Sequence, residues 1–213
     1  MSMAGTVNPQ DDEQNLINKA KHGSLDAFNT LVLRYQDRAY TVAYRIMNDE
    51  ASAADMAQDA FITAYRRLET YRGGSFRAWL LRIVTNTCYD ELRRYKRRPA
   101  TSLEDLPGAE MDDGPVLPDD APTPEQSAQQ SELNAAIQDC IQSLADGQRI
   151  ILVLSDIEGL SYQEVASTVG IKVGTVKSRL SRARVSVRDC LQAVQELLPS
   201  IYRLNNTDSQ PAD

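Results

Sequence analysis

The sequence GLSYQEVASTVGIKVGTVKSRLSRAR, residues 159–184, predicts two short helices joined by a tight turn. Ser161, with Glu164 three residues later, forms a capping box at the start of the first helix. Gly170 stands where that helix is expected to end in the left-handed region. A second helix is expected to begin near Gly174–Thr175. These positions predict a helix-turn-helix, a unit whose second helix enters the major groove of DNA.

The two predicted helices each carry an apolar face, as a packed pair requires. The inward positions, in chain order, are Val165, Ala166, Val169, Ile171, Val176, Leu180 and Ala183. The outer face of the second helix is basic, with six Lys or Arg residues from Lys172 to Arg188 and no acidic residue before Asp189. A solvated helix face normally carries both signs, so a face of one sign favours a polyanion as its partner.

The net charge of −7 over 213 residues is unusual for a protein that binds nucleic acid. Residues 99–125 account for it, because they hold eight acidic and no basic side chains. The segment 99–130 also contains six prolines and little apolar periodicity, so it cannot bury enough surface to fold alone. We expect an all-α fold in which a flexible acidic linker, residues 99–130, joins two small helical modules, residues 13–98 and 131–198. Residues 1–12 and 199–213 are expected to be disordered.

Several classes of protein are excluded by what the sequence lacks. It contains no phosphate-binding loop and no nucleophile–base pairing, so we do not expect an enzyme. His22 is the one histidine and Cys88, Cys140 and Cys190 are far apart, so we expect no metal or cofactor. Each cysteine lies in an amphipathic pattern and is expected to be a small buried hydrophobe. The polar N-terminus and the absence of a long apolar run favour a cytoplasmic protein without membrane insertion.

The first module shows three long helical patterns. Ser24 can cap the first of them, which is expected to end at Asn48–Asp49. A second helix is expected from about Ala51 to Leu68. The sequence YRGGSF, residues 71–76, breaks the pattern with two glycines, and a third helix follows from near Ser75 to about Arg94.

Two exposed patches are expected on these helices. Asp55, Gln58 and Asp59 lie near the start of the second helix, where acidic residues are also favoured by the helix dipole. Trp79 occupies a core position of the third helix, so Tyr89 is the better candidate for stacking on a base. Basic side chains interleaved with an aromatic and an amide suit single-stranded DNA. The exposed side of the third helix carries Arg77, Arg82, Asn86, Tyr89, Arg93 and Arg94.

Three segments together carry a family resemblance: DMAQDAF at residues 55–61, YRGGSFRAWLLRIVTNTCYDELRR at residues 71–94, and the quoted stretch 159–184. They resemble a bacterial RNA polymerase sigma factor of the extracytoplasmic-function group of the sigma-70 family. This group keeps only the second and fourth conserved sigma regions. The resemblance covers roughly residues 25–98 and 130–190, in the expected order.

The resemblance implies partners and site residues for a factor that directs promoter recognition, DNA melting and transcription initiation. Asp55, Gln58 and Asp59 match the patch that docks on the clamp helices of core RNA polymerase, which also binds such factors through its flap. The loop of residues 72–76 resembles the one that captures a base flipped from the minus-ten element, and the helix after it resembles the one that holds the separated strand. The implied minus-ten DNA contacts are Arg72, Gly73, Gly74, Ser75, Phe76, Arg77, Arg82, Asn86, Tyr89, Arg93 and Arg94. The implied minus-thirty-five DNA contacts are Thr175, Lys177, Ser178, Arg179, Ser181, Arg182 and Arg184.

Within the second set, Lys177, Ser178, Ser181 and Arg182 match positions that read bases, whereas Arg179 and Arg184 are assigned to phosphates. The two promoter elements lie about two helical turns apart, near 70 Å. The extended linker could reach about 110 Å, which is enough to span them. The family also implies an anti-sigma factor that covers both modules. The alternative is a stand-alone helix-turn-helix transcriptional regulator, which would leave YRGGSF and the basic helix after it without a purpose.

Overall fold

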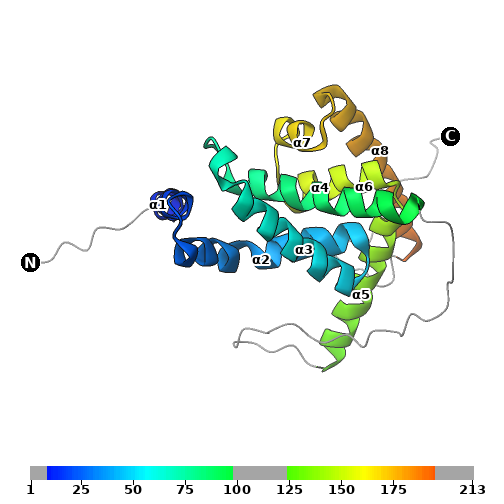
Figure 1. Ribbon diagram of the computed structural model, residues 1–213. Helices are drawn as coiled ribbons and strands as arrows, with labels where there is room; N and C mark the ends of the chain where they lie inside the picture. The colour runs from blue at the N-terminus through cyan, green and yellow to red at the C-terminus, as the bar shows by residue number, and fades with distance from the viewer. Residues whose placement is uncertain (1–8, 98–123, 195–213) are drawn as a thin grey trace, which may run out of the picture.

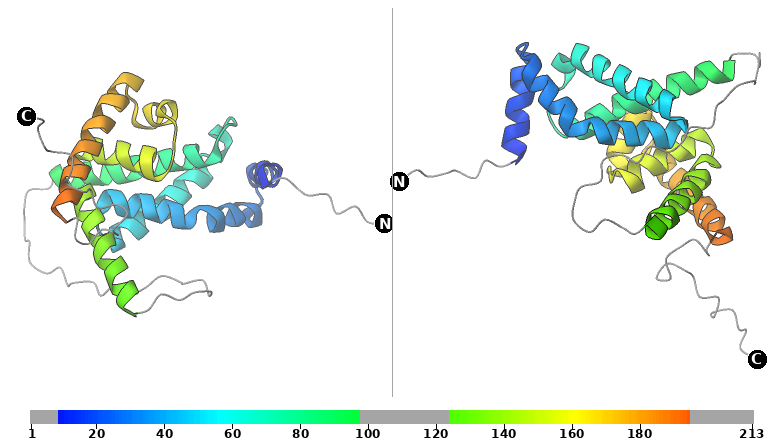
Figure 2. Two further views of the ribbon diagram at one scale, coloured as in Figure 1. Left: turned by 180° about the vertical axis from the view of Figure 1, so that it is seen from behind. Right: turned by 90° about the horizontal axis from the view of Figure 1, so that it is seen from below.

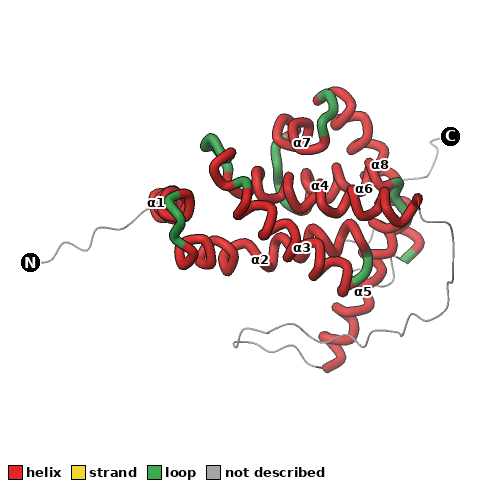
Figure 3. The backbone as a smooth tube through the Cα atoms, viewed as in Figure 1, coloured by secondary structure: helices red, strands yellow, loops and turns green. Residues whose placement is uncertain are grey.

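The computed structural model describes residues 9–97 and 124–194, and all of its regular structure within these ranges is helical (Figures 1 and 3). We call residues 9–97 the N-terminal module and residues 124–194 the C-terminal module. The first contains α1 (Pro9–Lys21), α2 (Leu25–Met47), α3 (Glu50–Arg66), the 3₁₀ turn η1 (Leu68–Thr70) and α4 (Phe76–Arg97). The second contains α5 (Pro124–Gln142), α6 (Asp146–Leu152), the π-helical turn η2 (Val153–Ile157), α7 (Tyr162–Val169) and α8 (Val173–Ala193).

Local capping signals set the ends of the helices in the N-terminal module. The Ser24 hydroxyl accepts a hydrogen bond from the Ala27 amide at 3.3 Å and begins α2. Asn48 adopts the left-handed conformation, with φ of 59°, and ends it. The Asp49 carboxylate accepts from the Ser52 amide at 2.7 Å and begins α3. The expected helix boundaries in this module are therefore confirmed to within a few residues.

The helix-turn-helix is confirmed in the C-terminal module. Both hydrogen bonds of the capping box between Ser161 and Glu164 are present, at 2.8 Å and 3.3 Å. Gly170 ends α7 with φ of 74°, a conformation that favours glycine. Val176 and Leu180 of α8 are buried, as expected from their spacing. The second helix of the motif begins at Val173, close to the expected Gly174–Thr175.

Some expected boundaries differ from the structure. Helix α1 begins at Pro9, inside the segment 1–12 that was expected to be disordered, and α5 begins at Pro124, inside the expected linker. The π-helical turn η2 was not predicted, because its sequence has the same apolar pattern as an α-helix. Most of the linker and all of the expected tail lie outside the described residues. Among the helices that the structure describes, none is both long and apolar enough to cross a bilayer.

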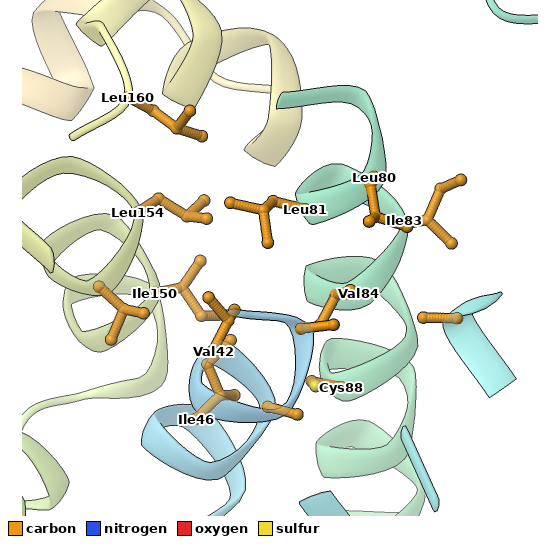
Figure 4. Close-up of a cluster of buried hydrophobic side chains, with 14 of the residues drawn as sticks. Val42, Ile46, Leu80, Leu81, Ile83, Val84, Cys88, Ile150, Leu154 and Leu160 are labelled. Atoms are coloured by element: carbon orange, nitrogen blue, oxygen red, sulfur yellow. The ribbon is translucent and has the colours of Figure 1, made fainter. Parts of the chain in front are cut away.

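The two modules pack against each other and share one hydrophobic core, which was not predicted (Figures 1 and 2). Helix α4 lies against α7, and α2 lies against α5, α6 and η2. Figure 4 shows Ile150 of α6 beside Val42 of α2, and Leu81 of α4 beside Leu154, with Leu160 above the two. All five side chains are nearly or fully buried. Each module therefore covers apolar surface of the other.

The cysteines behave differently from the expectation that each is a separate buried hydrophobe. Cys140 of α5 and Cys190 of α8 form a disulfide, with Cα atoms 5.6 Å apart. This corrects the interpretation of these two residues. Cys88 is a free, fully buried thiol, as expected, and burial raises its pKa to about 12.

Candidate nucleic-acid interface

An exposed polar strip runs along α4 opposite its buried side. Arg82, Asn86 and Arg93 are exposed at helical spacing, and Tyr89 is half-buried between them. The Arg93 guanidinium lies 4.6 Å from the centroid of the Tyr89 ring. This cation–π contact holds the ring beside a basic group at the surface. Arg94, next along the helix, is exposed but pairs with Glu91. The strip offers phosphate-binding charges and a stacking ring on one helix.

The YRGGSF loop is held in place by its own aromatic residues. Gly73 and Gly74 adopt φ of 97° and 88°, which strains any other residue. The Tyr71 hydroxyl donates to the Gly74 carbonyl at 2.7 Å. Phe76 is buried, with its ring centroid 5.5 Å from that of Tyr71 and 5.4 Å from that of Trp79. Of the residues assigned to this loop, Phe76 therefore anchors it, while residues 72–75 are exposed.

A hollow lies between this loop and α1, which sequence reasoning did not predict. Its walls include Glu13 and Gln14 of α1, Tyr35 of α2, and Ser75 and Arg77 beside the loop. The Tyr35 hydroxyl donates to Glu13 at 2.5 Å, and burial together with this carboxylate raises the pKa of Tyr35. The contact joins residues on separate helices, so no local pattern indicated it. The hollow places charged and amide groups next to the exposed backbone of Gly74.

Arg77, near the start of α4, is half-buried and interacts electrostatically with an acidic residue of the C-terminal module. Glu158, which follows η2, is only 8% exposed, and its carboxylate interacts with Arg77 and with Arg38. Burial raises the pKa of Glu158, and the two arginines oppose that shift. A residue assigned to minus-ten DNA thus interacts electrostatically with an acidic group of the other module.

Glu158→Gln is expected to stabilise the protein at pH 7, because an ionised carboxylate loses hydration when it is buried. A raised pKa in the folded state means that stability is lost as the pH rises through it. The excess in the free energy of unfolding of the variant over the unmodified protein should therefore shrink as the pH falls toward the ordinary pKa of glutamate. Urea unfolding at several pH values measures this difference. A pH-independent difference, like that expected for the exposed control Glu132→Gln, would contradict it.

The residues assigned to polymerase binding lie together on the surface of α3. Asp55, Gln58 and Asp59 are exposed, and neither aspartate forms an ion pair with any residue the structure describes. Asp55 lies beyond the first turn of α3, where the helix dipole has little effect on it. The helix dipole is therefore a weak explanation for an acidic residue at position 55.

An apolar groove between α2 and α3 adjoins this patch. Gln58 lines it together with Phe28, Tyr40, Phe61 and Tyr65. Tyr40 and Tyr65 are 37% and 39% exposed, which is high for aromatic side chains in a groove. Phe61 is half-buried in the wall of this groove, which residues of both α2 and α3 line. An apolar surface beside an acidic patch is a suitable site for another protein.

The residues assigned to upstream DNA fall into two groups on α8. Lys177, Ser178, Ser181 and Arg182 are exposed at the spacing of one helix face. Arg179 and Thr175 are half-buried, and Arg184 makes two hydrogen bonds to the Asp156 carboxylate, at 2.7 and 2.8 Å. These bonds raise the pKa of Arg184. The four positions matched to base readout are therefore free to enter a groove.

No group of three or more His, Cys, Asp or Glu side chains in residues 9–97 and 124–194 is arranged to hold a metal ion.

The candidate binding surfaces described above are a basic strip and loop on the N-terminal module, a basic helix on the C-terminal module, and an acidic patch beside an apolar groove on the N-terminal module.

Comparison with known proteins places the two modules in known families. The model of sigma-70 region 2 matches residues 31–98, and that of sigma-70 region 4 matches residues 134–187. The RNA polymerase sigma-H factor of Pseudomonas aeruginosa is 38% identical over 184 residues, covering 86% of this chain and 95% of that protein. The ECF RNA polymerase sigma-E factor of Escherichia coli K12 is 35% identical over 181 residues, covering 84% of this chain and 94% of that protein.

The fold is also similar to solved structures. One is the structure of CnrH in complex with the cytosolic domain of CnrY, with a TM-score of 0.62 and 28% identity. The match covers 86% of this chain and 99% of the solved chain. The similarity thus extends over both modules.

Proposed function

Because this chain belongs to the extracytoplasmic-function group of sigma-70 RNA polymerase sigma factors, we propose that it binds core RNA polymerase in the cytoplasm and starts transcription at promoters. In this proposal α8 reads the minus-thirty-five element through Lys177, Ser178, Ser181 and Arg182. The YRGGSF loop and the strip on α4 hold the separated minus-ten strand. The protein acts by binding, and the polymerase supplies the catalysis.

The observation that carries this proposal is the α4 strip next to a glycine loop in the same chain as the helix-turn-helix. A regulator that only binds duplex DNA needs α7 and α8 alone. The Tyr89 ring with Arg93 above it suits an unpaired base and its phosphate, and the hollow at Gly74 lies nearer the start of the same helix. Flipping a base costs a few kcal/mol, so free protein should bind promoter duplex weakly and open it only with polymerase.

The acidic patch and the groove between α2 and α3 are proposed as the polymerase contact. Asp55→Arg combined with Asp59→Arg is expected to weaken binding to core polymerase at least tenfold, because like charges at an interface cost several kcal/mol. A pull-down with purified core polymerase measures this loss. Transcription from a promoter template should fall in parallel, while circular dichroism shows unchanged helix content.

Glu69→Arg with Asp139→Arg is the matched control, since both residues are exposed and acidic but lie outside the patch. Equal retention of the patch variant and the control would show that the patch is not the contact. Repression by the free protein, with no copurifying polymerase, would instead favour the stand-alone regulator.

We also propose that a protein partner covers these surfaces when the factor is not needed. The structure of the relative CnrH was solved in complex with the cytosolic domain of CnrY. On the present chain, an anti-sigma factor would be the corresponding partner.

A further inference from the structure

The guanidinium of Arg184 on α8 is held by a residue that lies outside the helix-turn-helix. Its Nε atom donates to one oxygen of the Asp156 carboxylate at 2.8 Å, and its Nη2 atom donates to the other oxygen at 2.7 Å. Two parallel bonds of this kind fix the plane of the guanidinium as well as its position. A guanidinium carries five N–H groups, so three of them remain available to a second acceptor.

The anchor for this arginine stands on a firmly held part of the backbone. Asp156 belongs to the π-helical turn η2, in which the Glu158 amide donates to the Val153 carbonyl at 3.0 Å. Leu154, two residues before Asp156, is fully buried, and Glu158, two residues after it, is 8% exposed. The core therefore holds the chain on both sides of the carboxylate. Single π-helical turns are also frequent at functional sites.

The basic side chains assigned to upstream DNA are of two kinds. Lys177 and Arg182, matched to base readout, are exposed and form no ion pair among the described residues. Arg179, matched to a phosphate, is half-buried, and its Nη1 atom would lie 3.1 Å from a Cβ atom added at Gly147 of α6. Both arginines matched to phosphates are thus held against the segment that contains α6 and η2, whereas both cations matched to bases are free.

Arg184 shares a face of α8 with positions matched to base readout. It follows Lys177 by seven residues, almost two helical turns, and Ser181 by three. Phosphate contacts fix the register of a protein on the duplex. A donor that is held in one place meets a phosphate in one register only, whereas a mobile donor finds a phosphate in any register. An anchored arginine therefore adds to the difference between promoter and other DNA.

We propose that Asp156 is a specificity-determining residue, because it positions Arg184 for one phosphate of the upstream promoter element. Asp156 acts through the guanidinium and is a positioning residue, with no contact to DNA of its own. This role in specificity rests on the proposed function, since it requires α8 to lie on the minus-thirty-five element. The anchoring of Arg184 is a property of the free chain, so the two parts are tested separately.

The anchor is tested on the free protein by nuclear magnetic resonance of the arginine side chains. We expect the Nε–H proton of Arg184 to exchange with water about tenfold more slowly than that of Arg182, which is exposed on the same helix. Asp156→Asn should remove most of this difference, because it takes away the charge and one acceptor oxygen. Asp156→Glu should preserve it. Equal exchange rates for the two arginines in the unmodified protein would overturn the anchor.

Specificity is tested with core polymerase on a promoter template and on the same template with a scrambled upstream element. Asp156→Asn is expected to lower the ratio of initiation on the two templates about fivefold, within the range of couplings between residues in contact. Arg184→Lys should lower the ratio similarly, because lysine keeps the charge but loses the paired bonds. Asp156→Glu should retain most of the ratio.

Asp189→Asn is the matched control for this measurement. It removes one carboxylate from an ion pair with Arg188 on the same helix, beyond the residues assigned to DNA, and should leave the ratio unchanged. Binding of the free protein to a duplex of unrelated sequence distinguishes a lost position from a damaged fold. Asp156→Asn should strengthen this binding about threefold at low salt, because it frees a cation. A damaged C-terminal module would weaken it.

The variant Arg184→Ala shows whether Asp156 acts through this arginine. In that background Asp156→Asn should have no further effect on the ratio of initiation. An unchanged ratio in Asp156→Asn alone, or an equal loss in the Arg184→Ala background, would overturn the role of Asp156 in specificity. Failure of the unmodified protein to initiate with core polymerase would instead refute the proposed function, and this role with it. The exchange rate at Arg184 would still decide whether the anchor exists.

Discussion

Replacing Cys140 and Cys190 together by serine is expected to lower the free energy of unfolding by about 4 kcal/mol. The disulfide joins residues separated by 50 positions, and closing a loop of that length restricts the unfolded chain by roughly this amount. It connects the first helix of the C-terminal module to its last, so α5 and α8 should separate first in the variant. Urea unfolding followed by circular dichroism measures the change.

Reductant provides the control for this prediction. Dithiothreitol should lower the stability of the unmodified protein to that of the double serine variant and leave the variant unchanged. Cys88 is free and buried in both proteins, so it does not contribute to the difference. Equal midpoints for the unmodified protein with and without reductant would show that the disulfide does not stabilise the folded chain.

Lys177→Ala and Arg182→Ala are each expected to lower initiation at promoters that depend on the upstream element by five- to hundredfold. A lost contact to a base edge costs about 1–3 kcal/mol at that base. Both side chains are exposed on α8 and form no ion pair among the described residues. Initiation on a series of templates with single-base upstream changes locates the base that each side chain reads.

Arg188→Ala is the matched control, because Arg188 lies farther along α8 and pairs with Asp189. Losses that are equal on every template would assign Lys177 and Arg182 to phosphates instead. In that case the slope of log affinity against log salt concentration should also fall in magnitude by about one.

The parts of the fold that could be predicted from the sequence depend on neighbours within one turn. Ser161 with Glu164, Ser24 before α2, and Gly170 after α7 each act on backbone groups three or four residues away. Apolar periodicity placed the buried faces of α7 and α8 for the same reason. The exposed positions on α8 followed, because they are the remainder of a helix whose buried side was known.

The parts that could not be predicted depend on residues distant in the chain. Gln138 has no unusual neighbour in sequence, and its partners lie on α2. No spacing in the sequence identifies Cys140 and Cys190 as a disulfide pair. Each cysteine was therefore equally compatible with a separate position in the core. The hollow beside Gly74 needs Glu13 from α1, and the apolar groove needs side chains of both α2 and α3. The roles of the acidic patch came from family resemblance, and they remain predictions.

The contact between the two modules at the end of α2 differs on its two sides. On α2 its acceptors are mostly main-chain carbonyls, which every amino acid carries, so substitutions at Tyr44 or Ile46 leave the acceptors in place. On α5 and α6 its donors are the side chains of Gln138, Gln142 and Arg149. Substitutions that remove this contact are therefore expected at these three positions, whereas the sequence at the end of α2 can change without loss of the contact.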